Sequence, residues 1–107
     1  MDFALKKAEE IIKRFGTSDV FKIANRNEVS IVYESWFPVT IGEFERKTRT
    51  IKVNLQALQD EKTAKKLEKQ IIAHELGHFF ALDLKLNKKE EENFAHAFAE
   101  SLMRNNG

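Results

Sequence analysis

The stretch IIAHELGHFF, residues 71–80, places two histidines four positions apart with a glutamate beside the first. On a helix this spacing turns the side chain by about 40° and advances it by about 6 Å, so His74 and His78 point the same way. Two neutral imidazoles placed like this can bind one zinc ion at roughly 2.0–2.1 Å each. Glu75 lies one position further round and reaches past the ligands to a metal-bound water, where a general base acts in peptide hydrolysis. Gly77 fits this interpretation, because a side chain there would obstruct the neighbouring sheet or a substrate.

The alternative interpretation is a helix with two half-buried histidines that make ordinary hydrogen bonds, since short motif matches arise by chance. A catalytic zinc site usually has three protein ligands and one open position, so the metal interpretation requires a third ligand.

The last predicted helix offers that ligand in its first turn, which contains Glu90, Glu91 and Glu92. Glu92 shares its helical face with two alanines and the third histidine, and these small residues would let this helix pack closely on the motif helix. Glu91 shares its face with large apolar residues typical of a core, so Glu92 is the favoured ligand. Without a metal, the triplet would be a solvated acidic first turn that interacts favourably with the helix dipole.

His96 lies one turn after Glu92 and is the third histidine of the chain. The favoured hypothesis is that it hydrogen-bonds a metal ligand and orients it. A contact to the substrate or its oxyanion, a polar residue at the helix edge, and replacement of the glutamate as third ligand are the alternatives.

Two residues of the expected sheet are candidate substrate contacts. Gly42 lies in the second strand, where a glycine is more often a bulge, but a sheet edge there could bind an extended peptide by adding a strand. Tyr33, in the first strand, could donate a hydrogen bond to an oxyanion.

The elements that must position these residues follow from local patterns. A helix to Phe15 starts at Asp2 as its cap, and Thr17, Ser18 and Asp19 start a short helix that ends near Asn27. β-branched and aromatic residues predict strands over 28–35, 40–46 and 48–54, and Pro38 interrupts the strand pattern between the first two. Asp60 or Thr63 caps the motif helix, and a last helix runs from about Lys88 to Arg104. The prediction is an α+β domain with N-terminal helices, a three-stranded antiparallel meander, the motif helix and a C-terminal helix.

Length and composition limit the class of protein. A chain of 107 residues suits one domain, residues 1–107, and its net charge of +1 gives no reason to expect nucleic acid or an anionic membrane as a partner. The chain has no cysteine, which fits a reducing compartment and excludes thiolate zinc sites. We expect a soluble cytoplasmic protein, because no apolar run reaches the roughly 20 residues of a membrane helix.

With these residues in place, the chain resembles the ImmA/IrrE-type zinc metallopeptidases, which are compact gluzincins with a zincin-like fold. The resemblance covers most of the chain: GTSDVFKIANRNEVSIVY, then Gly42 and Phe44, TIKVNLQAL, the HEXXH stretch, and a glutamate-rich helix ending FAESLM. It implies one Zn²⁺ per chain held by His74, His78 and Glu92, with Glu75 as the base. The chain departs from the family pattern at His96, where the family has asparagine, at Glu100, where it has alanine, and in lacking a terminal proline.

The resemblance also implies partners. Members of this family act on helix-turn-helix repressors, and some minimal gluzincins self-associate. The leading hypothesis is therefore a zinc endopeptidase that cleaves a specific protein substrate, such as a helix-turn-helix repressor. The alternative is a non-catalytic, metal-containing binding or regulatory module of the same fold, and a third hypothesis is a metal-free regulatory protein. Metal content separates the third from the others, and loss of turnover on changing Glu75 separates the first two.

Overall fold

Helices precede and follow a small sheet along the chain in the residues described by this computed structural model, 2–37 and 40–105. Pro38 and the side chain of Asp2 lie outside that description. The elements are α1 (Asp2–Phe15), α2 (Val20–Arg26), β1 (Ser30–Glu34), β2 (Gly42–Glu45), β3 (Thr50–Asn54), η1 (Leu55–Leu58), α3 (Ala64–Phe80), η2 (Leu82–Leu84) and α4 (Lys88–Arg104). The α+β class predicted from the sequence is confirmed.

Local hydrogen bonds explain where several helices begin and end. Gly16 follows α1 with a φ of +69°, the left-handed conformation that favours glycine at a helix end. The side chain of Asp19 accepts from the first backbone N–H groups of α2, as predicted. Asn87 and Glu90 form a reciprocal capping box at the start of α4. Each cap fixes the residue at which the helix starts, and hence which side chains share a face.

The motif helix starts differently from the prediction. Thr63 stands at the cap position of α3, but its side chain makes no capping hydrogen bond. The carboxylate of Asp60 accepts from the backbone N–H of Lys62 in the preceding turn instead. The predicted side-chain cap is therefore wrong, although the helix begins at the expected place.

The sheet is mixed and its strand order is β1-β3-β2, so the predicted antiparallel meander is wrong. β2 pairs with β3 antiparallel, whereas β1 pairs with β3 parallel, because β3 inserts between the two earlier strands. Burial gives the physical reason: Ile51 and Val53 of β3 are fully buried, while β1 and β2 consist of half-buried and exposed residues. The most buried strand, β3, therefore lies at the centre of the sheet, and β2 is an edge strand.

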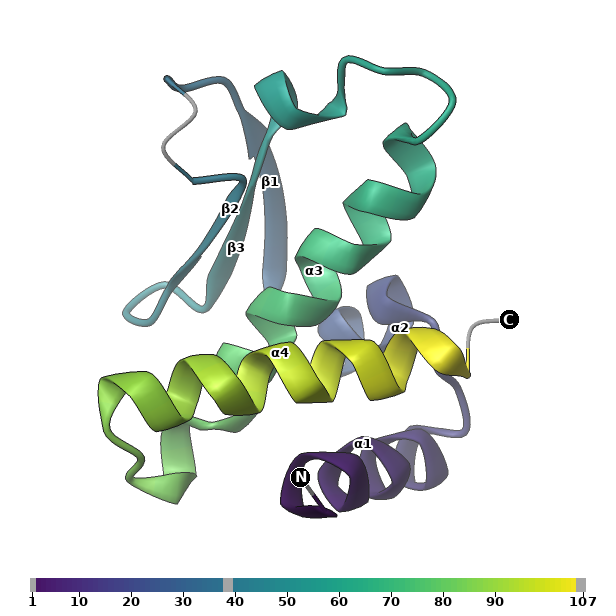
Figure 1. The fold of residues 1–107 in the computed structure, drawn as a ribbon, viewed down its shortest axis with the longest axis vertical. Helices are drawn as coiled ribbons and strands as arrows, with labels where there is room; N and C mark the ends of the chain where they lie inside the picture. Colours follow the sequence, from purple (N-terminus) through teal and green to yellow (C-terminus); the bar gives the residue numbers. More distant parts are fainter. Residues whose placement is uncertain (1, 38–39, 106–107) are drawn as a thin grey trace.

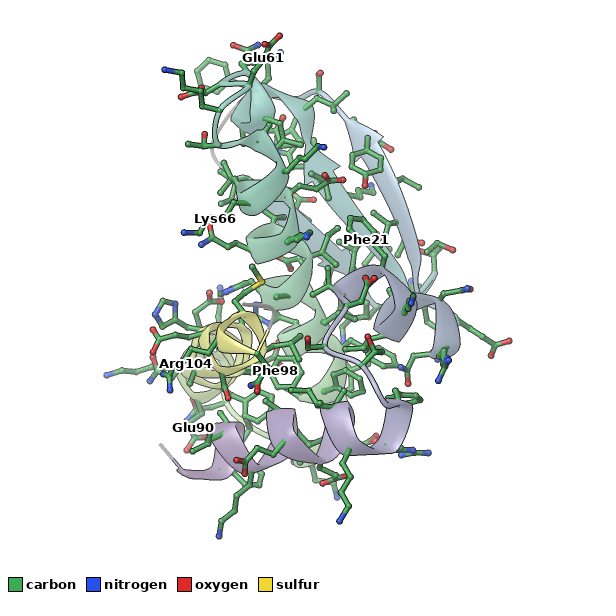
Figure 2. All side chains as sticks on the ribbon, turned by 90° about the vertical axis from the view of Figure 1, so that its right-hand side faces the viewer. Phe21, Glu61, Lys66, Glu90, Phe98 and Arg104 are labelled. Atoms are coloured by element: carbon green, nitrogen blue, oxygen red, sulfur yellow. The ribbon has the colours of Figure 1, made fainter. Side chains whose placement is uncertain are left out.

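The helices pack on this sheet and on one another. Figure 1 shows α3 running beside the sheet and then passing behind α4, with α1 beneath α4 in this view. Phe98 of α4 points inward, whereas Lys66 of α3 and Arg104 of α4 extend to the opposite side (Figure 2). The buried side chains form one core, whose largest members are Phe94, Phe98, Ile11, Ile23, Ile51, Ile72, Leu76 and Leu102. α3 is thus held between the sheet and α4, which places the motif between them.

None of the described helices is long and apolar enough to cross a membrane.

Candidate metal centre

Three side chains from two helices converge on one point. His74 and His78 lie one turn apart on α3, and Glu92 reaches across from α4. The Nε2 of His74 is 2.8 Å from one carboxylate oxygen of Glu92, and the Nε2 of His78 is 3.2 Å from the other. Within the part of the chain that the structure describes, these are the three residues whose donor atoms could hold a metal ion, all within 4.8 Å of one another.

The donor set fits a divalent metal. Zinc bonds of roughly 2.0–2.1 Å in tetrahedral geometry place neighbouring donor atoms about 3.3 Å apart, close to the two distances above. The carboxylate of Glu92 would offset one of the two charges of such an ion. Burial lowers the pKa of His74 below its usual 6.5, although Glu92 opposes this, so the imidazole is neutral at physiological pH and can act as a ligand. Its contact with Glu92 is then a hydrogen bond rather than an ion pair.

The close approach of α4 to α3 depends on Gly77, in the middle of the motif. A Cβ on this residue would lie 2.6 Å from the Cα of Ala95 and 3.0 Å from its carbonyl oxygen. The sequence interpretation named the sheet or a substrate as the neighbour of Gly77, and this is wrong, because the neighbour is α4. The predicted role of small residues on the Glu92 face is confirmed at Ala95.

The three consecutive glutamates at the start of α4 have three different partners. Glu90 closes the capping box, and Glu92 faces both histidines. Glu91 accepts a hydrogen bond from Nδ1 of His78, 2.7 Å from its Oε2. A proton held on Nδ1 leaves the lone pair of Nε2 directed at the metal position, so Glu91 fixes the tautomer and orientation of this ligand.

Sequence reasoning missed this role of Glu91 and assigned the corresponding role to His96. The side chain of His96 is 76% exposed, and its Nε2 lies 4.0 Å from a carboxylate oxygen of Glu100 rather than beside a hydrogen-bonding nitrogen of His74 or His78. The signal that could have identified Glu91 is the general need of a metal-bound histidine for an acceptor at its other nitrogen.

Glu75 follows His74 directly on α3, and its buried carboxyl lies next to Gly42 at the start of β2. Only 7% of the residue is exposed, and its carboxylate makes no hydrogen bond to the described residues. Burial raises the pKa of Glu75 to about 7, an effect to which Glu92 and Glu43 add and which His78 opposes. A carboxyl group with a pKa near neutrality can both accept and return a proton at physiological pH.

Gly42 makes room for this carboxylate. It is the first residue of β2 and pairs with Val53 in regular register, so the predicted bulge is wrong. A Cβ here would lie 2.5 Å from Cγ2 of Ile71 and 3.3 Å from Oε2 of Glu75. The missing side chain therefore lets the edge strand lie directly against the face of α3 that carries Ile71 and Glu75.

A cleft of about 940 Å³ opens beside the three donors, between α3, α4 and the start of β2. Lys66 and Arg104 line it from the two helices and extend on the same side of the molecule (Figure 2). Its apolar lining consists of Ile41, Leu67, Ile71, Ala99 and Met103. A second cleft of about 350 Å³ lies under β2 and shares Glu75 and His78 with the first. The candidate metal centre thus has an open groove on both sides.

Tyr33 is not part of this groove. It lies on β1, at the opposite edge of the sheet from β2, and its hydroxyl donates to Glu68, 2.5 Å away. Burial and this carboxylate raise the pKa of Tyr33 to about 12. The candidate role of Tyr33 as an oxyanion donor is therefore corrected, because its proton is already engaged by Glu68 at the opposite edge of the sheet.

Comparison of the chain with protein-family models, with curated proteins and with solved structures finds no match.

Proposed function

We propose that this protein is a zinc-dependent endopeptidase that hydrolyses peptide bonds of a specific protein substrate. One observation carries the proposal: the donor atoms of His74, His78 and Glu92 converge on one point, with the buried carboxyl of Glu75 beside them in an open cleft. Zinc is the ion best suited to two imidazoles and one carboxylate in a catalytic site with an open position.

The residues divide the chemistry between them. Bound zinc supplies a Lewis acid that polarises a carbonyl and acidifies water. Glu75 takes a proton from the attacking water and returns it to the leaving amine, which its near-neutral pKa allows in both directions. Glu91 keeps His78 in the required tautomer. The carboxylate of Glu75 has no competing hydrogen bond to the described residues, so it is available to the reactants.

The substrate would bind as an extended strand along β2. This strand pairs with β3 on one side, and on the other it has no strand partner among the residues described. Main-chain N–H and C=O groups at such an edge can bind a peptide by adding a strand to the sheet. Ile41 and Gly42 lie in the cleft wall, so a peptide paired there would pass directly over Glu75 and the metal position.

The resemblance to ImmA/IrrE-type peptidases supplies the proposed substrate, a helix-turn-helix repressor, and the proposed location, the cytoplasm. The absence of cysteine is consistent with a reducing compartment.

The test compares zinc-loaded wild type with Glu75→Gln on a candidate repressor at stoichiometric enzyme. A general base contributes typically 10²–10⁴-fold, so cleavage should fall by at least about a hundredfold in the variant while zinc content stays near one per chain. Glu90→Gln, on the same helix as Glu92 but used as a helix cap, is the matched control. Zinc-loaded wild type that cleaves no candidate substrate would favour the non-catalytic binding module, and equal cleavage by both proteins would show that Glu75 is not the base.

A further inference from the structure

Asn54 is a fully buried polar residue at the end of the central strand, outside the metal centre. Its side chain uses its full hydrogen-bonding capacity, because an amide has two donor hydrogens and two acceptor lone pairs. Nδ2 donates to the carbonyls of Trp36 at 3.2 Å and Thr40 at 3.0 Å. Oδ1 accepts from the backbone N–H of Trp36 at 3.4 Å and of Gln56 at 3.0 Å. Three of these four bonds hold Trp36 and Thr40, two residues that precede β2.

The backbone of Asn54 holds the same segment. Its N–H donates to the carbonyl of Ile41 at 3.0 Å, one residue beyond the last ladder pair of β2 and β3. β1 ends at Glu34 and β2 begins at Gly42, so Trp36 and Thr40 lie outside regular strand pairing, whereas the bond to Ile41 extends the β2–β3 ladder by one residue. The buried side-chain amide of Asn54 hydrogen-bonds the backbone of Trp36 and Thr40, as a neighbouring strand would do in a regular sheet.

This segment forms the wall of the cleft that faces the metal ligands. Thr40, Ile41 and Gly42 line the cleft from the sheet side. Ile41 is 51% exposed, so its side chain is available to a bound molecule. The metal ligands themselves lie on α3 and α4, and Asn54 touches neither ligand histidine nor Glu92 in the described contacts.

We propose that Asn54 is a positioning residue for substrate binding, which fixes the entrance of the edge strand along which the peptide pairs. This inference rests on the proposed function, since it assigns the binding half of that activity to a residue remote from the metal. Loss of the amide donors frees the Thr40 and Trp36 carbonyls and lets the strand entrance move, while the metal centre keeps its geometry. Asn54 therefore governs peptide affinity and leaves metal affinity unchanged.

The test uses two hydroxamates on zinc-loaded protein, a leucyl peptide hydroxamate that spans the cleft and acetohydroxamate, which reaches only the metal. Asn54→Asp keeps the acceptor for Gln56 and removes both amide donors. We expect this change to lower the affinity for the peptide hydroxamate by at least about tenfold and the affinity for acetohydroxamate by less than about twofold. Asn27→Asp is the matched control, because it removes one amide donor at the end of α2, away from the cleft. It should change neither affinity.

A second readout needs no metal and no activity. Trp36 is the single tryptophan of the chain, so its fluorescence reports this segment directly. Asn54→Asp should shift its emission and increase its quenching by acrylamide, whereas Asn27→Asp should not. If Asn54→Asp fails to fold, Asn54→Ser, which keeps a neutral acceptor for Gln56, is measured in the same way.

The outcomes separate this inference from the proposed function. Equal losses for both hydroxamates would mean that Asn54 supports the whole fold, and unchanged affinities would mean that it has no role in binding; either overturns the inference. Wild type that binds zinc but binds both hydroxamates equally also overturns it and leaves the zinc site standing. Wild type that takes up no zinc overturns the proposed function itself.

Discussion

Gly77 of α3 and Ala95 of α4 meet so closely that a Cβ on the glycine would lie 2.6 Å from the Cα of the alanine. This contact sets the distance between the two helices at the turn that carries the candidate metal ligands. Glu92 lies one turn before Ala95 on α4, and His74 and His78 lie on either side of Gly77 along α3. The separation of the three donors therefore depends on a residue that has no chemistry of its own.

Gly77→Ala should destabilise the protein, against the usual preference of helices for alanine. In an ordinary helix interior the change would stabilise by about 1 kcal/mol. Here the new methyl group meets backbone atoms of α4, and overpacking of this kind costs typically about 1–3 kcal/mol. Urea unfolding of the metal-free protein gives the sign, and zinc affinity should fall because Glu92 moves away. A more stable variant with normal zinc affinity would contradict the packing of α4 on α3.

Alanine variants of the three consecutive glutamates of α4 should differ in zinc affinity. Wild type should bind about one zinc per chain, and alanine at His74 or His78 should remove it. Glu92→Ala loses a ligand and should have the largest effect of the glutamate series. Glu91→Ala leaves His78 without its acceptor and should cost about 10–100-fold, with partial rescue in Glu91→Gln, whose carbonyl oxygen still accepts. Competition against a chromophoric chelator at neutral pH measures all of these.

Glu90→Ala is the control in that series, because Glu90 belongs to the capping box and faces no histidine. It should lower stability by about 1 kcal/mol and leave zinc affinity unchanged. If Glu91→Ala loses more affinity than Glu92→Ala, the assignment of ligand and orienting residue is reversed.

The motif could be predicted from the sequence because the helix period alone brings His74 and His78 to one face. The choice of Glu92 followed from small residues on its face, a pattern that helix packing requires. The partner of Gly77 could not be predicted, since a glycine in a sequence shows that something lies close and not which element it is. The prediction of strand order was wrong for a similar reason. Local patterns identify strands, but the order depends on which strand is buried at the centre of the sheet, and here that strand is β3, between β1 and β2. Locally, Asn54 could be recognised only as the cap of η1, because the partners of its two amide donors lie 14 and 18 residues away.

The pH dependence of stability should reveal the buried carboxyl of Glu75 in metal-free protein. Its pKa is about 7 in the folded state and 4.5 ordinarily, so the folded state binds more protons between these values. Stability then falls as pH rises from about 4.5 through about 7, by about 3 kcal/mol at most. The lowered pKa of His74 acts in the opposite sense, and it is common to wild type and Glu75→Gln.

The difference between these two proteins isolates the effect of Glu75. Urea unfolding in the presence of a chelator at pH 5 and pH 8 should show Glu75→Gln gaining stability relative to wild type at the higher pH. Parallel stability curves would indicate that the carboxyl of Glu75 titrates normally and is better solvated than its burial implies.

Gly42→Ala should disturb the surroundings of Glu75 more than the candidate metal site. The new Cβ would lie 2.5 Å from Cγ2 of Ile71 and 3.3 Å from Oε2 of Glu75, so β2 must move outward or the carboxylate must turn. β2 carries no candidate metal ligand, and we therefore expect near-normal zinc content with a stability loss of about 1–3 kcal/mol and a larger relative loss of cleavage.

A double-mutant cycle with Ile71→Ala tests the cause, because that change removes Cγ2. Ile71→Ala alone should cost about 2–5 kcal/mol for the cavity it leaves, and the double variant should cost clearly less than the sum of the two. Additive losses would show that the strand does not press on Ile71, and that Gly42 is required for another reason.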